Sequence, residues 1–222
     1  MMPNKSSKHP FIVIEALDAG GSQTQTDLLT SRLRREKINT LQLHFPHEDR
    51  ATGRLIYDKF LHNHNRHNFS KREQALLYIQ DFYSRNEDII DHLKSGDQRA
   101  VVSDRYCTST YAYQTIGLAG RARKNMINWL NWLCYEKEPH LHRPDAVIFL
   151  DTPVETSLQR LSSKKNDYFE NKQKLTAIRN SYLKIAHEQK WHVLDSMNTN
   201  NQERTRADLH RAIWQLVAPL LH

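Results

Sequence analysis

Short apolar runs alternate with longer helical patterns along this chain of 222 residues. Five runs rich in β-branched and aromatic residues predict strands, at residues 11–16, 40–45, 100–103, 146–150 and 191–194. Three of them are mostly apolar instead of alternating, which is typical of parallel strands that helices cover on both faces. Strands that alternate with helices imply right-handed crossovers. We therefore expect an α/β fold of three layers, with a five-stranded parallel sheet flanked by helices.

The clearest helical pattern begins at Ser70, where the sequence Ser-Lys-Arg-Glu forms a capping box with Glu73. Apolar residues recur at helical spacing from Ile79 to Leu93, and the pattern stops near Gly96. We expect one helix over this segment. Because the chain has no internal repeat, low-complexity tract or linker, we expect a single domain over residues 10–222 after a disordered or extended tail of residues 1–9.

The composition indicates a folded protein without a membrane segment. Hydrophobic residues make up 38% of the chain, and no apolar run approaches the roughly 20 residues that a membrane-spanning helix needs. The apolar stretch near the start is short and is interrupted by Glu15, so it makes a poor secretory signal. We expect a cytoplasmic protein that has no membrane partner.

The net charge of +7 permits binding to an anionic ligand. The cations are scattered, as on ordinary solvated helices, and no basic block reaches five residues. The chain also lacks the interleaved aromatic and basic residues that are typical of sheets that bind RNA. We therefore expect no nucleic-acid partner, although the positive charge leaves a nucleotide- or nucleic-acid-binding protein as an alternative.

Two adjacent glycines, among only six in the chain, follow the first predicted strand. A strand, a turn of small residues and a helix N-terminus together make an anion site, because unpaired amides and the helix dipole attract negative charge. The phosphate-loop pattern G-x-x-x-x-G-K-[ST] is not met. Aligned on Gly21, its first glycine becomes Ala16, its lysine becomes Ser22 and its hydroxyl residue becomes Gln23. The segment alone is compatible with a phosphate-binding loop or with a simple strand-to-helix turn.

An Asp-Arg pair ends the third predicted strand. Open parallel sheets bind ligands beyond the carboxyl ends of their strands, which is where Asp104 and Arg105 would lie. The arginine can bind a phosphate bidentately, and the carboxylate can orient a hydrated magnesium ion. A structural ion pair is the alternative interpretation.

Several collinear segments, spanning roughly residues 11–196, resemble the thymidylate kinase family. FIVIEALDAGGSQTQ is similar to the family's F-I-V-x-E-G-x-D-G-x-G-K-[ST]-T-Q, and FPHEDRATGRLI is similar to F-P-R…T-x-x-G-x-L-I. RPDAVIFLDTPVETSLQRL resembles a P-D-(apolar)-L-D-x-P…R strand and helix. The most specific match is DRYCTSTYAYQ, from Asp104 to Gln114, against D-R-Y-x-x-S-[ST]-x-A-Y-Q.

This resemblance implies a P-loop kinase fold with a short lid at about residues 160–170. It further implies a homodimer that transfers the γ-phosphate of ATP to dTMP with Mg²⁺, giving dTDP for dTTP biosynthesis. For the reaction to occur, the carboxyl ends of the first and third strands must converge on the two nucleotides.

The resemblance also implies the site residues, each at a position that matches the family's motifs. The ATP phosphates would lie against Ala19, Gly20, Gly21, Ser22, Gln23 and Thr24. The catalytic groups would be Asp18 between the nucleotides, Arg105 on the dTMP phosphate, and the lid cations Lys164 and Lys165. Asp104 would order the magnesium region, and Tyr113 would select deoxyribose. The dTMP site would comprise Phe45, Arg54, Tyr78, Arg105, Ser109, Thr110, Tyr113 and Gln114.

The sequence departs from the family's pattern most clearly where Ser22 replaces the loop lysine. His47 replaces the arginine of F-P-R, and Phe82 replaces an arginine expected after Asp81. Losing one preorganised donor commonly costs on the order of 10²–10³ in rate. Either nearby cations compensate, or the protein is a catalytically impaired nucleotide-binding homologue; a P-loop deoxynucleoside kinase is a further alternative. The candidate cations are Arg50, Arg54, Arg85, Lys164 and Lys165.

Overall fold

The predicted parallel sheet is present. A computed structural model describes residues 9–221 except 62–68, 95, 97 and 163–171. Each predicted strand is confirmed, with ends that differ by about one residue: β1 (Phe11–Ala16), β2 (Asn39–His44), β3 (Arg99–Asp104), β4 (Ala146–Asp151) and β5 (His192–Asp195). All pairings are parallel, and the strand order is β2-β3-β1-β4-β5.

The central strand β1 lies between β3 and β4. Ile14 is opposite Asp104 on one side and Ile148 on the other, and the Arg105 amide donates to the Ile14 carbonyl at 3.0 Å. Because parallel strands end at the same edge of a sheet, the carboxyl ends of β1 and β3 lie next to each other. The expected convergence of these two strand ends is therefore confirmed.

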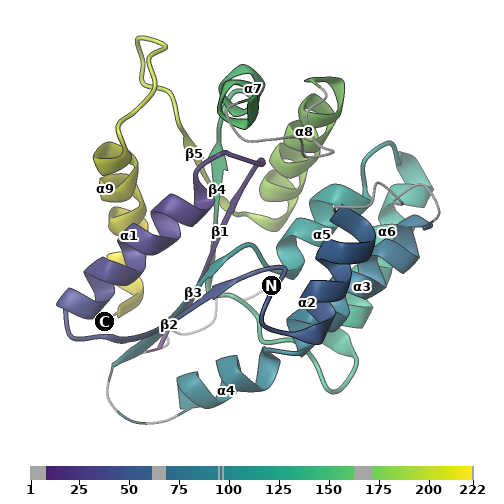
Figure 1. The fold of residues 1–222 in the computed structure, drawn as a ribbon, viewed down its shortest axis with the longest axis horizontal. Helices are drawn as coiled ribbons and strands as arrows, with labels where there is room; N and C mark the ends of the chain where they lie inside the picture. The colour runs from purple at the N-terminus through teal and green to yellow at the C-terminus, as the bar shows by residue number, and fades with distance from the viewer. Residues whose placement is uncertain (1–8, 62–68, 95, 97, 163–171, 222) are drawn as a thin grey trace.

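Helices cover both faces of the sheet (Figure 1). Ile12 and Ile14 of β1 face a core with α1 (Ser22–Arg35), α9 (Arg206–Val217) and the 3₁₀ turn η4 (Ala218–Leu221). Phe11 and Val13 point to the opposite face, because side chains alternate along a strand. The helices on that face include α3 (Lys71–Tyr83), α5 (Cys107–Gln114), α6 (Gly120–Asn131) and α8 (Lys172–Gln189).

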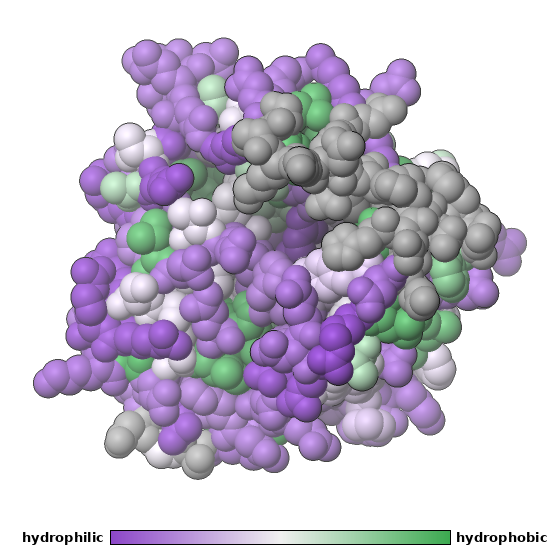
Figure 2. Space-filling view, viewed as in Figure 1, coloured by the Kyte–Doolittle hydropathy of each residue, from purple (hydrophilic) through white to green (hydrophobic). Residues whose placement is uncertain are grey.

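Shorter elements complete the described fold: α2 (Ala51–Ile56), η1 (Tyr57–Leu61), α4 (Asn86–Lys94), η3 (Trp132–Glu136) and α7 (Val154–Ser162). Figure 2 shows a face on which hydrophilic residues predominate and hydrophobic residues form small separate groups. Within the described part of the chain, no helix combines the length and apolarity required to cross a membrane. Residues 1–8 of the expected tail and 163–170 of the expected lid lie outside the described residues.

The expectation of a single helix from Ser70 to Gly96 is wrong, because α3 and α4 are separate helices. The predicted capping box of Ser70 at the start of α3 is confirmed. At the end of α3, the Ser84 hydroxyl donates to the Asp81 carbonyl at 2.7 Å, which competes with helical bonding. Asn86 then anchors the start of α4, because its side-chain amide donates to the His140 carbonyl at 2.9 Å.

Candidate active site

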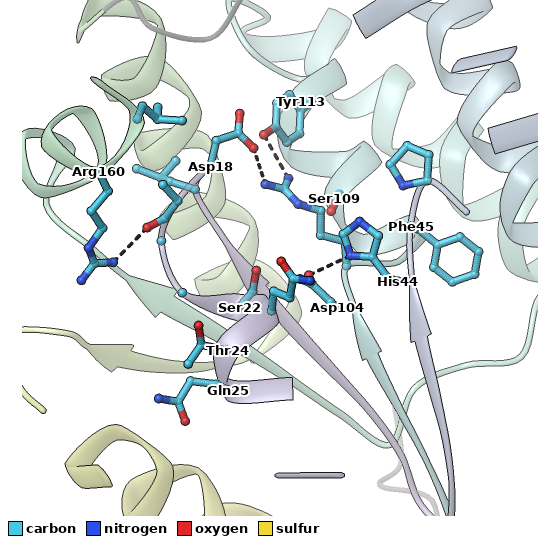
Figure 3. Close-up of a pocket in the computed structure, with 18 of the residues that line it drawn as sticks. Asp18, Ser22, Thr24, Gln25, His44, Phe45, Asp104, Ser109, Tyr113 and Arg160 are labelled. Carbon is cyan, nitrogen blue, oxygen red and sulfur yellow. Dashed lines mark hydrogen bonds and ion pairs between the residues drawn. The ribbon is translucent and has the colours of Figure 1, made fainter. Parts of the chain in front are cut away.

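A cavity of about 700 Å³ opens at the carboxyl edge of the sheet, where β1, β2 and β3 end. The segments after these strands line it together with parts of α3, α5, α7 and α9 (Figure 3). Most predicted site residues line this cavity: Asp18, Ala19, Gly20, Gly21, Ser22, Gln23, Thr24, Phe45, Tyr78, Asp104, Arg105, Ser109, Thr110, Tyr113 and Gln114.

The β1–α1 loop, residues 17–21, is a tight turn that leads into α1. The Gly20 amide donates to the Leu17 carbonyl at 2.8 Å, and Gly21 is the N-cap of α1 with φ of 99°. A Cβ added to Gly20 would lie 2.8 Å from the Ala16 Cβ, so the turn requires glycine there. The N-cap makes no side-chain hydrogen bond, and the first turn of α1 carries no acidic residue. The amides of this turn can therefore receive an anion.

Arg105 connects the ends of β3 and β1. Its guanidinium donates to Asp18 Oδ1 at 2.5 Å and to the Tyr113 hydroxyl at 3.1 Å. Burial is the largest single influence and opposes its charge, but Tyr113, Asp18, Tyr182 and Asp104 together raise the pKa of Arg105 above its ordinary value. The backbone of Arg105 is left-handed, with φ of 65°, and the Ser103 hydroxyl donates to its carbonyl at 2.6 Å. Such strain persists where the surrounding structure holds it, as at functional sites.

The Glu15 carboxylate, fully buried at the end of β1, accepts four hydrogen bonds. The donors are the Tyr106 amide at 3.3 Å and the hydroxyls of Thr108, Ser109 and Tyr182 at 2.5, 2.6 and 2.9 Å. Burial raises the pKa of Glu15, more than nearby Arg105 and the hydroxyl donors lower it. Glu15 thereby fixes the first turn of α5. Sequence reasoning missed this role; the available signal was a single carboxylate inside an apolar strand.

Asp104 at the end of β3 is paired with His44 at the end of β2. His44 Nδ1 lies 2.8 Å from Asp104 Oδ2, and the Tyr57 hydroxyl lies 3.5 Å from His44 Nε2. Burial raises the pKa of Tyr57 to about 12, so this phenol keeps its proton. All three residues line the cavity, although sequence reasoning selected only Asp104.

Aromatic rings form one wall of the cavity. Phe45 is buried, and its ring meets Phe82 edge-on at 5.0 Å. Tyr113 lies edge-on to Tyr182 at 5.9 Å. Phe45, Tyr78, Phe82 and Tyr113 all line the cavity and provide a surface for a planar, largely apolar group.

Three arginines line the cavity beside the β1–α1 loop: Arg160 of α7, Arg204 just before α9, and Arg206 at the start of α9. Arg160 donates to the Ala19 carbonyl at 2.9 Å and forms an ion pair with Glu203. Arg204 donates to backbone carbonyls, whereas the backbone carbonyl of Arg206 accepts from Gln25 of α1. This end of the cavity is therefore cationic and adjoins the N-terminus of α1.

Two carboxylate oxygens in the cavity lining lack a partner among the described residues. They are Asp18 Oδ2 and Asp104 Oδ1, and both atoms are buried. Buried polar atoms in native proteins are nearly always paired, so these two oxygens in the cavity lining are candidate acceptors for a ligand.

A model of the thymidylate kinase family matches residues 14–207. The chain belongs to the thymidylate kinase family. A thymidylate kinase from Thermosipho africanus is 30% identical over 179 residues, which cover 79% of this chain and 84% of that protein. One from Plasmodium falciparum is 28% identical over 219 residues, which cover 99% and 94%.

A solved structure of the thymidylate kinase from Candida albicans has the same fold. Its TM-score is 0.70 at 22% sequence identity, and the match covers 95% of this chain and 92% of that one. The three-layer α/β architecture is thus that of the thymidylate kinase family.

Three arginines named as candidate cations, of which Arg54 is also a predicted dTMP-site residue, do not line the cavity. Arg54 is exposed and donates to the Asp49 carbonyl at 3.3 Å. Arg50 and Arg85 both pair with Asp88, at 3.2 and 3.1 Å. None of these three arginines is among the residues that line the cavity in the described part of the chain. Lys164 and Lys165 lie outside the described residues.

Proposed function

We propose that this protein is a thymidylate kinase that transfers the γ-phosphate of ATP to dTMP, giving dTDP and ADP. The main support is that Asp18 and Arg105, from the ends of adjacent strands, meet in a cavity beside a helix N-terminus. Family membership supports the choice of reaction. Phosphoryl transfer depends on positioning and on charge stabilisation, and this cavity has groups for both.

On the acceptor side, Arg105 binds the phosphate of dTMP. Asp18 orders Arg105 through one oxygen, and its orphaned Oδ2 accepts from a sugar hydroxyl. Tyr113, held by the same guanidinium, crowds the 2′ position and selects deoxyribose. The base lies against Phe45 and Tyr78. The remaining polar contacts come from Ser109, Thr110 and Gln114.

On the donor side, the β1–α1 loop and the first turn of α1 bind the ATP phosphates through backbone amides. The residues at these positions are Ala19, Gly20, Gly21, Ser22, Gln23 and Thr24. Ser22 stands where the family has its lysine and supplies no charge. We infer that lid cations replace it, with Lys164 and Lys165 joining Arg160, which already contacts the loop.

The carboxylate of Asp104 suits magnesium, which prefers oxygen ligands. Its Oδ1 is buried, lacks a partner among the described residues and belongs to a side chain that lines the cavity. Asp104 would hold the ion or one of its waters. The ion would neutralise charge on the ATP phosphates.

A coupled assay of ADP release with ATP, Mg²⁺ and dTMP tests this function. We expect turnover with dTMP and little with thymidine. Turnover with thymidine alone would identify a deoxynucleoside kinase, and nucleotide binding without turnover would identify an impaired homologue.

A lysine introduced at position 22 tests the donor side. If Ser22→Lys raises the rate by orders of magnitude, the native loop is simply impaired. If the rate falls, another cation occupies the place of the missing lysine. Gln80→Lys, at an exposed position of α3 outside the cavity lining, is the matched control and leaves the rate unchanged.

We also infer a cytoplasmic homodimer. Leu55 and Leu76 are 43% and 47% exposed on the packed helices α2 and α3, which is compatible with a protein interface. Sedimentation equilibrium should give twice the monomer mass. A monomer at all concentrations tested would refute this inference.

A further inference from the structure

His44 and Asp104 lie directly opposite each other across two parallel strands. The register of β2 and β3 pairs these two residues, so their side chains leave the sheet on the same face at its ligand-binding edge. His44 Nδ1 lies 2.8 Å from Asp104 Oδ2 (Figure 3). The Asp104 side chain is 4% exposed, whereas that of His44 is 47% exposed. The imidazole therefore covers one oxygen of a buried carboxylate from the solvent side.

The direction of this hydrogen bond follows from the chemistry of the partners. An ionised carboxylate only accepts hydrogen bonds, so Nδ1 of His44 must carry a hydrogen and donate it. The Tyr57 hydroxyl lies on the other side of the ring, 3.5 Å from Nε2, a separation that gives at most a weak hydrogen bond. The strong bond to Asp104 is thus the one that fixes both the ring and the carboxylate.

The two oxygens of Asp104 have different surroundings. Oδ2 accepts from His44, whereas Oδ1 is buried and has no partner among the described residues. A carboxylate held through one oxygen cannot rotate without breaking that bond. Its second oxygen is then kept ready for a ligand that favours hard oxygen donors, as a divalent cation does.

We propose that His44 is a positioning residue, which holds Asp104 so that Oδ1 remains available to the magnesium ion of the bound nucleotide. The proposal rests on the proposed function for the presence of a metal–nucleotide complex in this cavity. Carboxylates that bind metals are commonly held by an outer hydrogen bond, and removing that bond typically weakens metal affinity about 10–100-fold. His44 acts through Asp104 and does not itself contact the ion.

Two substitutions separate positioning from mere packing. His44→Asn retains an amide donor near the place of Nδ1, whereas His44→Leu retains bulk but has no donor. His192→Leu, at an exposed position on the edge strand β5, is the matched control. The primary measurement is the affinity for Mn²⁺, read by electron paramagnetic resonance with the protein saturated in ADP. ADP affinity in EDTA and thermal unfolding of the metal-free protein are measured in parallel.

We expect His44→Leu to weaken Mn²⁺ binding about 10–100-fold, with ADP affinity in EDTA unchanged. His44→Asn and the His192→Leu control should stay within a few-fold of the wild type. Wild-type Mn²⁺ affinity in His44→Leu would overturn the proposal, even if the variant were less stable. Equal losses in the leucine and asparagine variants would also overturn it, because the donor would then be irrelevant.

These measurements separate the inference from the reaction itself. A wild type that binds Mn²⁺ and ADP but does not phosphorylate dTMP would refute the proposed function, while the variants still test His44. An active wild type with an unaltered His44→Leu metal affinity would refute the role of His44 alone. A wild type that binds no Mn²⁺ would overturn the proposal about His44 directly.

Discussion

Replacing Glu15 by alanine removes the common acceptor of the donors that hold the first turn of α5. Glu15 is completely buried and accepts from the Tyr106 amide and from the hydroxyls of Thr108, Ser109 and Tyr182. Ser109 lines the cavity and can turn to water. The other three donors would be left without their acceptor inside the protein.

The size of the effect follows from this burial. Leaving a buried donor without its acceptor costs about 1–3 kcal/mol, and for the three donors together we expect a loss of about 3–5 kcal/mol in free energy of unfolding. In a protein of this size each kcal/mol lowers the melting temperature by about 2–4 °C. We therefore expect Glu15→Ala to lower it by about 6–20 °C. Glu15→Gln keeps an oxygen for Tyr106 and Thr108 and should lose only about 1 kcal/mol.

The pH dependence of stability gives a second measurement. Because burial raises the pKa of Glu15 above its ordinary value of 4.5, the folded protein binds this proton more tightly than the unfolded chain does. The stabilisation that the folded protein gains from binding this proton is therefore fully present below pH 4.5. It is lost as pH rises through the raised pKa of Glu15. The Glu15→Gln variant lacks this titration. The free energy of unfolding of the wild type should therefore exceed that of Glu15→Gln by less as pH rises.

Urea unfolding of the wild type and both variants, at several pH values above 4.5, measures these differences. The KM for dTMP should rise in Glu15→Gln, since Ser109 and Arg105 flank the turn that Glu15 holds. A free energy of unfolding of Glu15→Ala that lies within about 0.5 kcal/mol of the wild-type value would refute the argument. A difference between wild type and Gln that grows with pH would refute the pKa direction.

Three further substitutions test other parts of the structure. Gly20→Ala places a Cβ 2.8 Å from the Ala16 Cβ, so urea unfolding should show a loss of about 1–3 kcal/mol; an unchanged midpoint would contradict the tight turn. Arg123→Ala breaks a bidentate pair with Glu188, both bonds 2.8 Å, and should cost about 1.5–3 kcal/mol in the same assay. Arg105→Ala should lower kcat/KM for dTMP by on the order of 10²–10³, and a smaller effect on dTMP than on ATP would contradict its assignment.

The strands and the β1–α1 loop could be predicted because their signals are local. Continuous apolar runs indicate buried parallel strands, and glycines after the first run indicate a turn into a helix. The break between α3 and α4 could not be predicted, because Ser84 and Arg85 fit the helical pattern of the sequence. The break depends on the hydrogen bond that the Ser84 hydroxyl donates to the Asp81 carbonyl. Local patterns do not show where a short polar side chain finds its partner.

Much of the site geometry depends on sheet register, which the sequence does not display. His44 and Asp104 are 60 positions apart and meet only because β2 and β3 pair in one register. In the sequence, Glu15 only interrupts an apolar run. In the structure, hydroxyl groups from α5 and α8 donate hydrogen bonds to its carboxylate. Arg54 shows the opposite case. The family resemblance predicts a substrate-binding cation at this position, but its guanidinium donates to the backbone carbonyl of Asp49.

The bond between Arg105 and Asp18 affects how an empty site responds to stray anions. Among the described residues, Asp18 and Tyr113 accept from two of the five N–H groups of that guanidinium. At this position, free phosphate or sulfate would meet an arginine whose charge is already partly balanced by Asp18. A whole nucleotide also gains contacts along its sugar and base. The Asp18 carboxylate can therefore reduce the binding of common cellular anions at Arg105 more than it reduces the binding of the substrate.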